Sequence, residues 1–444
     1  MGFPHMTYAH LYRHRWLLIR LPIVLAVMVM AAATWWWLYP MPSTQLTISS
    51  GQADGAYQRH AMRYAEAFSR HGISLEIHSS EGSATNLQRL QAQPPQTDLA
   101  LVQGGFGWSS AAGAARRAAD VQTLGSVDIE VLWLFSRDQP MTSLLDLAGK
   151  RVAAGPEGSG HRAMLQRLLK QMHVDLGQVA LTAHSGVAAR DALLRHEVDA
   201  VFMVAAPSAP GIGALLAARG VHLASLRRTA AISERNNYLE NRLLPEDALG
   251  PRQPPADTPV LTTPTHLLVR QDLDPALKRL AIAVAMEVHG GADAFHRAGE
   301  FPALRFSDFP SAPEARRVLS QGLGGLEALL PFWWAQVLQR LLVIGVPMLL
   351  LALVLARLVP AWVRWRLEHR VTRWYGELRF IENDLANNAV NLGGMDLSRI
   401  HGRLNGMEMA IVGEGLPPEL AQRCYTLRQH VNFVRQRIRE YRGR

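Results

Sequence analysis

Residues 46–57 read Leu-Thr-Ile-Ser-Ser-Gly-Gln-Ala-Asp-Gly-Ala-Tyr, a short β-rich run that leads through a glycine turn into a helical pattern. The helix is expected over Ala56–Arg70, where Met62, Ala65 and Phe68 would share one face. Further β-rich runs alternate with helical stretches along the central part of the chain. Strands separated by helices of this length predict parallel α/β layers.

Three glycine-containing turns stand where a predicted strand ends and a helix begins. They cover residues 50–57, 80–86 and 155–161. Such turns expose backbone N–H groups at the positive end of the helix dipole, where a carboxylate or a phosphate can bind. None has the spacing of a dinucleotide fingerprint or the Lys-Ser/Thr ending of a phosphate-binding loop. Each turn taken alone could be a tight turn that binds no ligand. The occurrence of three such turns in one predicted fold is what indicates a binding site.

The composition indicates folded domains, since 48% of the 444 residues are apolar and 19% are charged. The formal net charge is +9, and the excess lies in residues 1–39 and 357–444, while residues 40–356 are balanced. A nucleic-acid-binding domain would carry basic residues on its own surface, so no nucleic-acid partner is expected. Cys424 is the one cysteine, which excludes a disulfide framework and a zinc site of several thiolates. The sequence also lacks a zinc-protease motif and a nucleophile elbow, so we expect no enzyme, no metal and no cofactor.

Two long apolar segments are predicted to cross a membrane. Residues 17–39 end in a tryptophan cluster, and residues 341–363 are interrupted by Arg357 near their end. A helix of this length reaches about 34 Å, enough to span a bilayer. A cleaved signal peptide is the alternative for the first segment, because Ala31, Ala32 and Ala33 offer a small-residue cleavage site. A buried core helix is the alternative for the second segment.

The basic residues predict the orientation of these spans. Arg13 and Arg15 precede the first span, and Arg364 and Arg366 follow the second. The positive-inside rule therefore places both termini in the cytoplasm. Residues 1–16 form a cytoplasmic leader in this topology, and the domain between the spans lies in the periplasm, outside the inner membrane.

The tail, residues 364–444, has the pattern of three amphipathic helices. Apolar residues step by four and three, as in a coiled-coil seam, with breaks at Gly393-Gly394 and Pro417-Pro418. An antiparallel hairpin or a small bundle is expected, with a homodimer through the tail as one arrangement. A solvated stabilising segment and a signalling module are both compatible with the pattern.

Several motifs of the central region occur in the order found in one family of binding proteins. They are Ser50-Gly51 with Gly55 and Tyr57, Gly82-Ser83 with Asn86, residues 98–103, residues 146–152, Gly158-Ser159-Gly160 and residues 198–202. In these motifs the region resembles the TAXI family, the solute-binding subunits associated with tripartite ATP-independent periplasmic (TRAP) transporters. Residues 329–335 resemble the join to the second span in the membrane-anchored branch of that family, which makes 329–340 an interfacial segment.

The resemblance implies a type II periplasmic-binding-protein fold, an α/β architecture of two lobes with the ligand in the cleft. The periplasmic domain would be residues 43–325, with lobe 1 formed by 43–136 and 234–325 and lobe 2 by 137–233. The chain would cross between the lobes near residues 136–138 and 227–233.

The resemblance also implies which residues contact the ligand. They are Gly51, Gly55, Tyr57, Gly82, Ser83, Asn86, Gln103, Gly158, Ser159, Gly160 and His161. Three positions depart from the family pattern, which commonly has glycine at Asp54, a second aromatic residue at Gln58 and threonine at His161. Asp54 would oppose an anionic ligand unless it points outward or pairs with Arg162, and a solvent-facing position is the alternative for His161.

We therefore expect a membrane-anchored solute-binding protein that captures a small, carboxylate-containing solute for a TRAP-type transporter. The permease would be a separate subunit, because two spans do not form a transport pathway of the known repeat type. The alternative is a transmembrane receptor that signals solute occupancy through the helical tail. Deletion of residues 368–444 would separate the two, because only the receptor needs the tail for its output.

Overall fold

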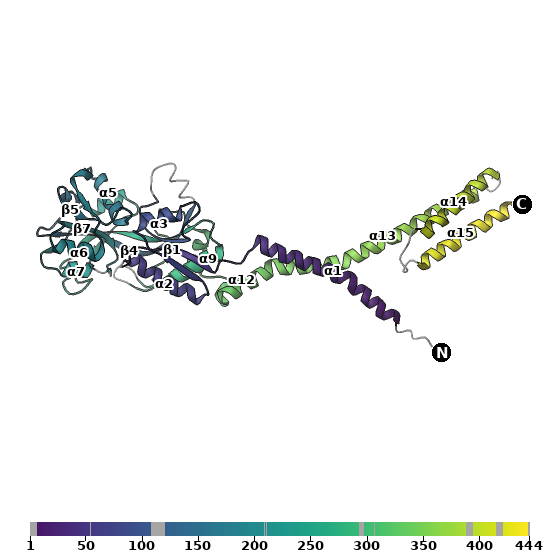
Figure 1. Cartoon of the computed structure of the whole chain (residues 1–444), viewed down its shortest axis with the longest axis horizontal. Helices are drawn as coiled ribbons and strands as arrows, with labels where there is room; N and C mark the ends of the chain where they lie inside the picture. The colour runs from purple at the N-terminus through teal and green to yellow at the C-terminus, as the bar shows by residue number, and fades with distance from the viewer. Residues whose placement is uncertain are drawn as a thin grey trace. The chain divides into compact units, whose positions relative to one another are not determined.

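The computed structural model describes residues 7–53, 55–107, 120–207, 209, 211–292, 297–305, 307–387, 394–413 and 421–442. The chain forms two compact units. One consists of residues 41–339, and the other combines residues 1–40 with residues 340–444. Figure 1 shows the course of the chain with its element labels.

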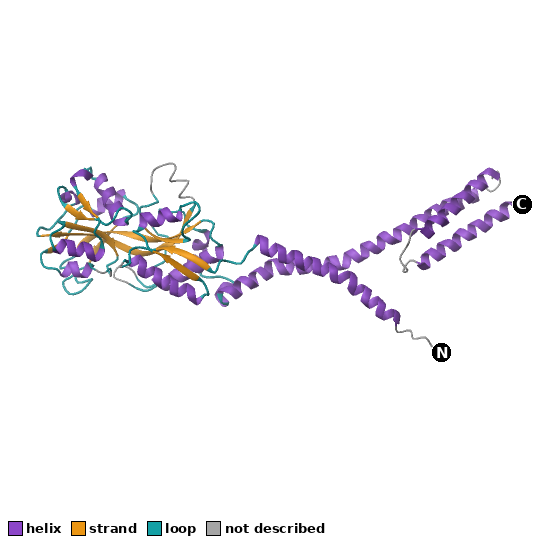
Figure 2. Cartoon of the chain, viewed as in Figure 1, coloured by secondary structure: helices purple, strands orange, loops and turns teal. Residues whose placement is uncertain are grey.

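Within the described part of residues 41–339, one mixed sheet of ten strands forms the centre (Figure 2). Its strands are β1 (Gln45–Ser49), β2 (Ser74–His78), β3 (Leu99–Gln103), β4 (Val121–Arg137), β5 (Arg151–Ala153), β6 (Ala180–Thr182), β7 (Ala200–Ala205), β8 (Val221–Leu223), β9 (Glu240–Leu244) and β10 (Thr258–Arg270). Their order is β2-β1-β3-β10-β4-β7-β5-β6, with β8 paired to β4 and β9 paired to β10. The pairs β1–β2, β1–β3, β5–β6 and β5–β7 are parallel, as predicted, whereas β4 and β10 run antiparallel to their neighbours.

The sheet is accompanied by helices along the same stretch of chain. They are α2 (Ala56–Arg70), α3 (Ser83–Leu90), α5 (Gly160–Gln171), α6 (Gly186–Leu194), α7 (Ile212–Ala217), α8 (Thr229–Arg235), α9 (Pro275–His289), α10 (Pro313–Gln321), α11 (Leu326–Leu329) and α12 (Phe332–Arg340), with 3-10 turns at Leu144–Leu147 and Leu176–Gln178. The predicted helix Ala56–Arg70 is confirmed. Its buried face is Ala61, Tyr64, Ala67 and Phe68, so the prediction was wrong for Met62, which is exposed.

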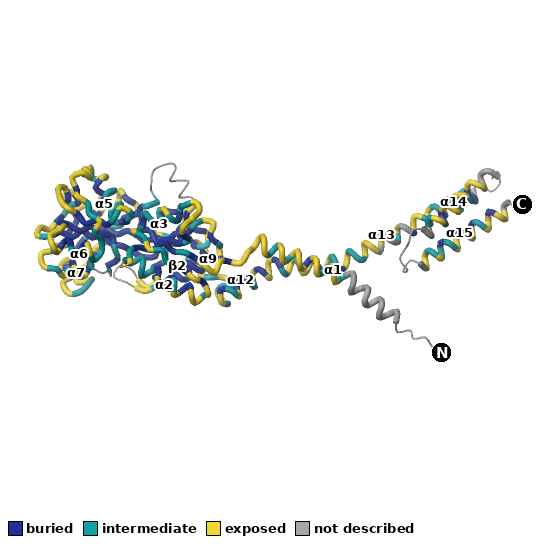
Figure 3. The backbone as a smooth tube through the Cα atoms, in the orientation of Figure 1, coloured by how far each residue is buried: buried dark blue, intermediate teal, exposed yellow. Residues whose placement is uncertain are grey.

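Two long strands, β4 and β10, join two lobes. In β4, Leu124 and Val127 belong to one core and Leu132 and Leu134 to another. In β10, Leu267 packs in the first of these cores and Leu261 in the second. We call residues 41–127 and 267–339 the first lobe, and residues 132–261 the second lobe. Buried residues concentrate along the strands (Figure 3).

The crossings between the lobes differ from the predicted ones near residues 136–138 and 227–233. They lie inside β4, between Val127 and Leu132, and inside β10, between Leu261 and Leu267. The return comes late because β9 pairs with the first residues of β10, which keeps residues 234–261 on the second lobe. An uninterrupted strand passes from lobe to lobe without a turn, so no turn residue marks the crossing.

The second unit contains the apolar helices. They are α1 (Thr7–Leu38) and α13 (Val346–Asn387), the latter preceded by a π-helical turn at Leu341–Gly345. In the described part of the chain, two helical segments are long and apolar enough to cross a membrane, Arg20–Leu38 and Phe332–Val363. They overlap the two spans predicted from the sequence, and α1 packs against α13.

The tail helices share one core. Residues from α13, α14 (Gly394–Gly413) and α15 (Ala421–Arg442) meet in it. The core consists of Val371, Leu378, Ile381, Leu385, Ile400, Leu404, Met407, Leu427, Val431, Val434 and Ile438, and Cys424 packs against it. These are residues of the predicted seam, so three helices do pack through it. A coiled coil and a homodimer stay predictions.

Candidate functional site

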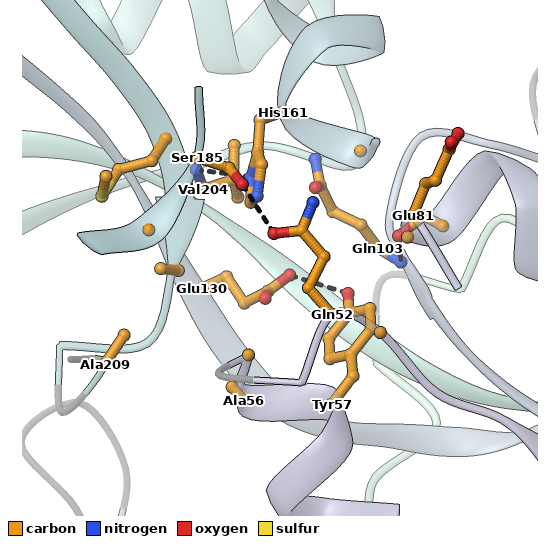
Figure 4. Close-up of a pocket in the computed structure, with 18 of the residues that line it drawn as sticks. Gln52, Ala56, Tyr57, Glu81, Gln103, Glu130, His161, Ser185, Val204 and Ala209 are labelled. Atoms are coloured by element: carbon orange, nitrogen blue, oxygen red, sulfur yellow. Dashed lines mark hydrogen bonds between the residues drawn. The ribbon is translucent and has the colours of Figure 1, made fainter. Parts of the chain in front are cut away.

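A cavity of about 320 Å³ lies between the two lobes. The first lobe and β4 contribute Gly51, Gln52, Ala53, Gly55, Ala56, Tyr57, Glu81, Gly82, Ser83, Gln103 and Glu130. The second lobe contributes Gly160, His161, residues 185–188, residues 203–205 and Ala209. Figure 4 shows Tyr57, Gln103 and Glu130 around this space, with His161 and Ser185 on the opposite wall.

Four helices begin at the wall of this cavity. They are α2, α3, α5 and α6, and lining residues include Ala56, Ser83, Gly160 and Gly186, the first residue of each. The first N–H groups of a helix have no partner within the helix, and the helix dipole adds positive potential there. In the described part of the chain, the N-cap residues of α2, α3 and α6 make no side-chain hydrogen bond to the N–H groups of the first helical turn. The cavity wall therefore presents backbone donors suited to an anionic group.

His161, the second residue of α5, presents an uncharged imidazole to the cavity. Its Nδ1 accepts a hydrogen bond from the backbone N–H of Val204 at 3.0 Å. This bond leaves the ring proton on Nε2. Removal from water lowers the pKa of His161 to about 4. At neutral pH the side chain is therefore a neutral N–H donor, and it lines the cavity.

We expect acid to destabilise the folded state through His161. The pKa of its imidazole is about 4 in the folded protein and about 6.5 in the unfolded chain, so the unfolded chain binds its proton first as the pH falls. Stability is thus lost between about pH 6.5 and 4, by up to about 3 kcal/mol. Replacement His161→Gln should flatten this part of the profile. Chemical denaturation of both proteins at pH 7 and pH 4.5 measures it, and equal losses in the two would contradict the assignment.

A hydrogen-bonded pair, Tyr57 and Glu130, forms the floor on the β4 side. The Tyr57 hydroxyl donates to Glu130 Oε2 at 3.0 Å (Figure 4). Burial, and then the nearby charge of Asp128, raise the pKa of Glu130 to about 8. Burial also raises the pKa of Tyr57. The Glu130 carboxyl group therefore carries little negative charge at neutral pH. It repels an anion in the cavity less than an ionised glutamate would.

Most of the predicted site residues line the cavity. These are Gly51, Gly55, Tyr57, Gly82, Ser83, Gln103, Gly160 and His161. Asp54 lies outside the described residues. Gln52, Glu81, Glu130 and the start of α6 also line it and were not predicted. Glu130 could have been noticed in the sequence, because it is an acidic residue within the apolar run of β4. The turn before α6 contains a single glycine, so nothing in its sequence pointed to a binding site.

Three predicted residues have other roles in the structure. Asn86 is fully buried, and its amide donates to the carbonyl groups of Ser50 and Leu101 at 2.5 and 2.8 Å. It thereby fastens α3 to β3 and to the turn after β1. Ser159 caps α5, since its hydroxyl accepts from the Arg162 N–H. Gly158 donates its N–H to Glu81 Oε2 at 3.2 Å, a contact between the lobes rather than a wall of the cavity.

The lobes also touch beside the cavity. The Ser185 hydroxyl donates to Gln52 Oε1 at 2.6 Å across it (Figure 4). At Gly82, which has a φ of +137°, an added Cβ would lie 3.3 Å from Ser159 Cα of the other lobe. The glycine turns thus allow close approach of the two lobes as well as access to backbone N–H groups.

The fold and the site together define a two-lobed α/β protein with a small-molecule cavity between its lobes. A family model described as the NMT1-like family matches residues 58–298, more than half of the chain. The chain therefore belongs to the NMT1-like family. No curated protein matches its sequence. The resemblance to the TAXI family stays a prediction at this finer level.

Similar solved structures include periplasmic binding proteins. The alkanesulfonate-binding protein of Xanthomonas axonopodis pv. citri has 15% identity, with 56% of this chain and 74% of that chain covered and a TM-score of 0.35. An arginine-specific periplasmic binding protein of Salmonella typhimurium has 14% identity, 57% and 96% coverage and a TM-score of 0.33. The periplasmic aliphatic sulphonate binding protein of Escherichia coli has 16% identity, 56% and 80% coverage and a TM-score of 0.31. At these values the similarity carries no argument about the ligand of this chain.

Proposed function

We propose that this chain is a membrane-anchored solute-binding protein that captures a small carboxylate-bearing solute and delivers it to a TRAP-type permease. The observation that carries the proposal is the convergence of four helix N-termini, those of α2, α3, α5 and α6, on one cavity. Backbone N–H groups fixed in this way bind an anion without having to rearrange. The volume of about 320 Å³ favours a solute of few heavy atoms.

The side chains of the cavity support a polar solute with an apolar body. Gln52 and Gln103 offer amide groups and His161 offers one N–H donor, while Tyr57 presents a ring on which the solute body can stack. Glu130 lies at the opposite wall from His161 and can accept a hydrogen bond from a donor on the solute (Figure 4). A solute with a carboxylate at the helix N-termini and a hydrogen-bond donor facing β4 would therefore have hydrogen-bond partners on both walls of the cavity.

Features of the sequence support the proposed membrane anchoring and the proposed permease partner. The segments Arg20–Leu38 and Phe332–Val363 flank the binding unit and have the length and apolarity of spans. The basic residues outside them favour cytoplasmic termini and a periplasmic cavity. Because two spans form no transport pathway of the known repeat type, the solute would pass to a separate permease subunit.

A ligand screen on the full-length chain tests this function. The protein, purified in detergent, is heated with each member of a panel of mono- and dicarboxylic acids, amino acids and sulfonates. We expect at least one carboxylate to raise the Tm, since a ligand that binds only the folded state stabilises it. A flat response from folded protein across the whole panel would contradict the function, and a response to sulfonates alone would contradict the carboxylate assignment.

A further inference from the structure

A second group of polar side chains lies where the first lobe meets the part of β4 that joins the lobes. His60 on α2, Asp128 on β4 and His289 at the end of α9 meet there, although they are far apart in the sequence. One potential ligand atom of each lies within 4.8 Å of those of the other two. His60 Nε2 is 3.3 Å from Asp128 Oδ2, and the two imidazole rings have centroids 4.6 Å apart.

We propose that His60, Asp128 and His289 bind a divalent transition-metal ion, with Zn²⁺ as the ion that fits the donor set. Two imidazoles and one carboxylate, without a thiolate, are ligands that Zn²⁺ accepts in tetrahedral sites. Bonds of about 2.0–2.2 Å would place ligand atoms about 3.4 Å apart. The 3.3 Å pair already has this spacing, and small rotations of the imidazole rings would bring in the third atom.

The surroundings of the three residues favour an ion over an isolated ion pair. Asp128 and His289 are buried, so a bound cation would be enclosed, while the His60 side chain is 17% exposed and leaves a path for entry. The Tyr64 ring lies 5.7 Å from the His289 ring, and its fully buried hydroxyl has no hydrogen-bond partner among the described residues. The Tyr64 hydroxyl, or a water bonded to it, could complete the coordination. The neighbouring cation, Arg63, donates to the Val288 carbonyl at 2.6 Å and is thereby engaged on α9.

Such an ion would fasten α9 to α2 and β4, the two elements that carry the Tyr57–Glu130 pair of the cavity floor. His60 lies one turn beyond Tyr57 on α2, and Asp128 lies two residues before Glu130 on the same face of β4. An ion held by all three ligands would join α2, β4 and α9 directly behind the Tyr57–Glu130 pair. Its role would be structural, and its effect would be measurable without any solute.

The test uses the full-length chain in detergent, purified with a tag that contains no histidine and stripped with a chelator. Added Zn²⁺ should bind at one ion per chain by elemental analysis and raise the Tm by about 5 °C at saturation. The variants His60→Gln and His289→Gln should lose both effects. The control His78→Gln removes an imidazole that pairs with Glu76 at 3.1 Å on the surface of the same lobe, and it should keep both.

Wild-type protein that neither retains Zn²⁺ nor changes its Tm would overturn the proposal. Folded His60→Gln and His289→Gln variants that keep both effects, or loss of Zn²⁺ binding in His78→Gln, would overturn it as well. If either glutamine variant fails to fold, Co²⁺ titration of the wild-type protein decides the matter. A tetrahedral visible absorption band at one equivalent supports the site, and its absence overturns it.

Discussion

Replacement of Gly160 by alanine should weaken solute binding by about 100-fold. A Cβ at this position would lie 2.5 Å from Gln103 Oε1 and 3.1 Å from Ser83 Oγ, both on the opposite lobe. These side chains line the cavity, so moving them away disturbs two contacts and holds the lobes apart. The loss of two polar contacts to an anion, each about 1.5 kcal/mol or more, corresponds to a change of this size.

The matched control for this substitution is Gly213→Ala. Gly213 lies in α7 of the second lobe, and among the described residues no atom outside its own stretch of helix lies within 4 Å of an added Cβ. Both variants change a helical glycine, but only one faces the other lobe. Equal affinities in the two variants, measured by titration with the strongest ligand of the panel, would contradict the role given to the Gly160 turn.

Tyr57→Ala and Gln103→Ala should each weaken binding by about tenfold to 100-fold while the protein stays folded. Each removes a side-chain contact to the solute, which costs on the order of 1.5–3 kcal/mol. Tyr57→Phe keeps the ring and loses the hydrogen bond from the hydroxyl to Glu130, so it should cost less than Tyr57→Ala. The measurement is the dissociation constant of the strongest panel ligand. Unchanged affinity in both alanine variants would show that the solute binds elsewhere.

The sequence predicted the parts of the fold that depend on local pattern. Strand, glycine turn and helix follow one another in residues 46–70, and the structure has β1 and α2 there. Tyr57, Ser83 and Gly160 lie at the starts of three helices, which is why motifs at such starts located much of the cavity wall. The backbone geometry of a helix N-terminus is a local property, so it can be found without knowing the tertiary fold.

The features that the sequence did not reveal depend on tertiary contacts. The crossings inside β4 and β10 have no turn, so their places follow only from which strands pair. Glu130 reaches the cavity because β4 continues past the lobe boundary. The resemblance to the TAXI family assigned Asn86 to the ligand, whereas in the structure its buried amide donates to the Ser50 carbonyl group.

The group of His60, Asp128 and His289 illustrates the same limit. A metal motif is recognised in a sequence by ligands that stand a few residues apart. His60, Asp128 and His289 are far apart along the chain, so they form no such motif. They come together only because α2 and α9 both pack beside β4 in the first lobe. The sequence therefore gave no reason to expect a metal.

The most direct measurement is a calorimetric titration of the strongest carboxylate of the panel into the full-length wild-type protein and into Gly160→Ala. If the cavity between the lobes captures the solute, the wild type binds one molecule per chain and the variant binds about 100-fold more weakly. No heat from any panel carboxylate with folded wild-type protein, or the same affinity in the two proteins, would contradict the account.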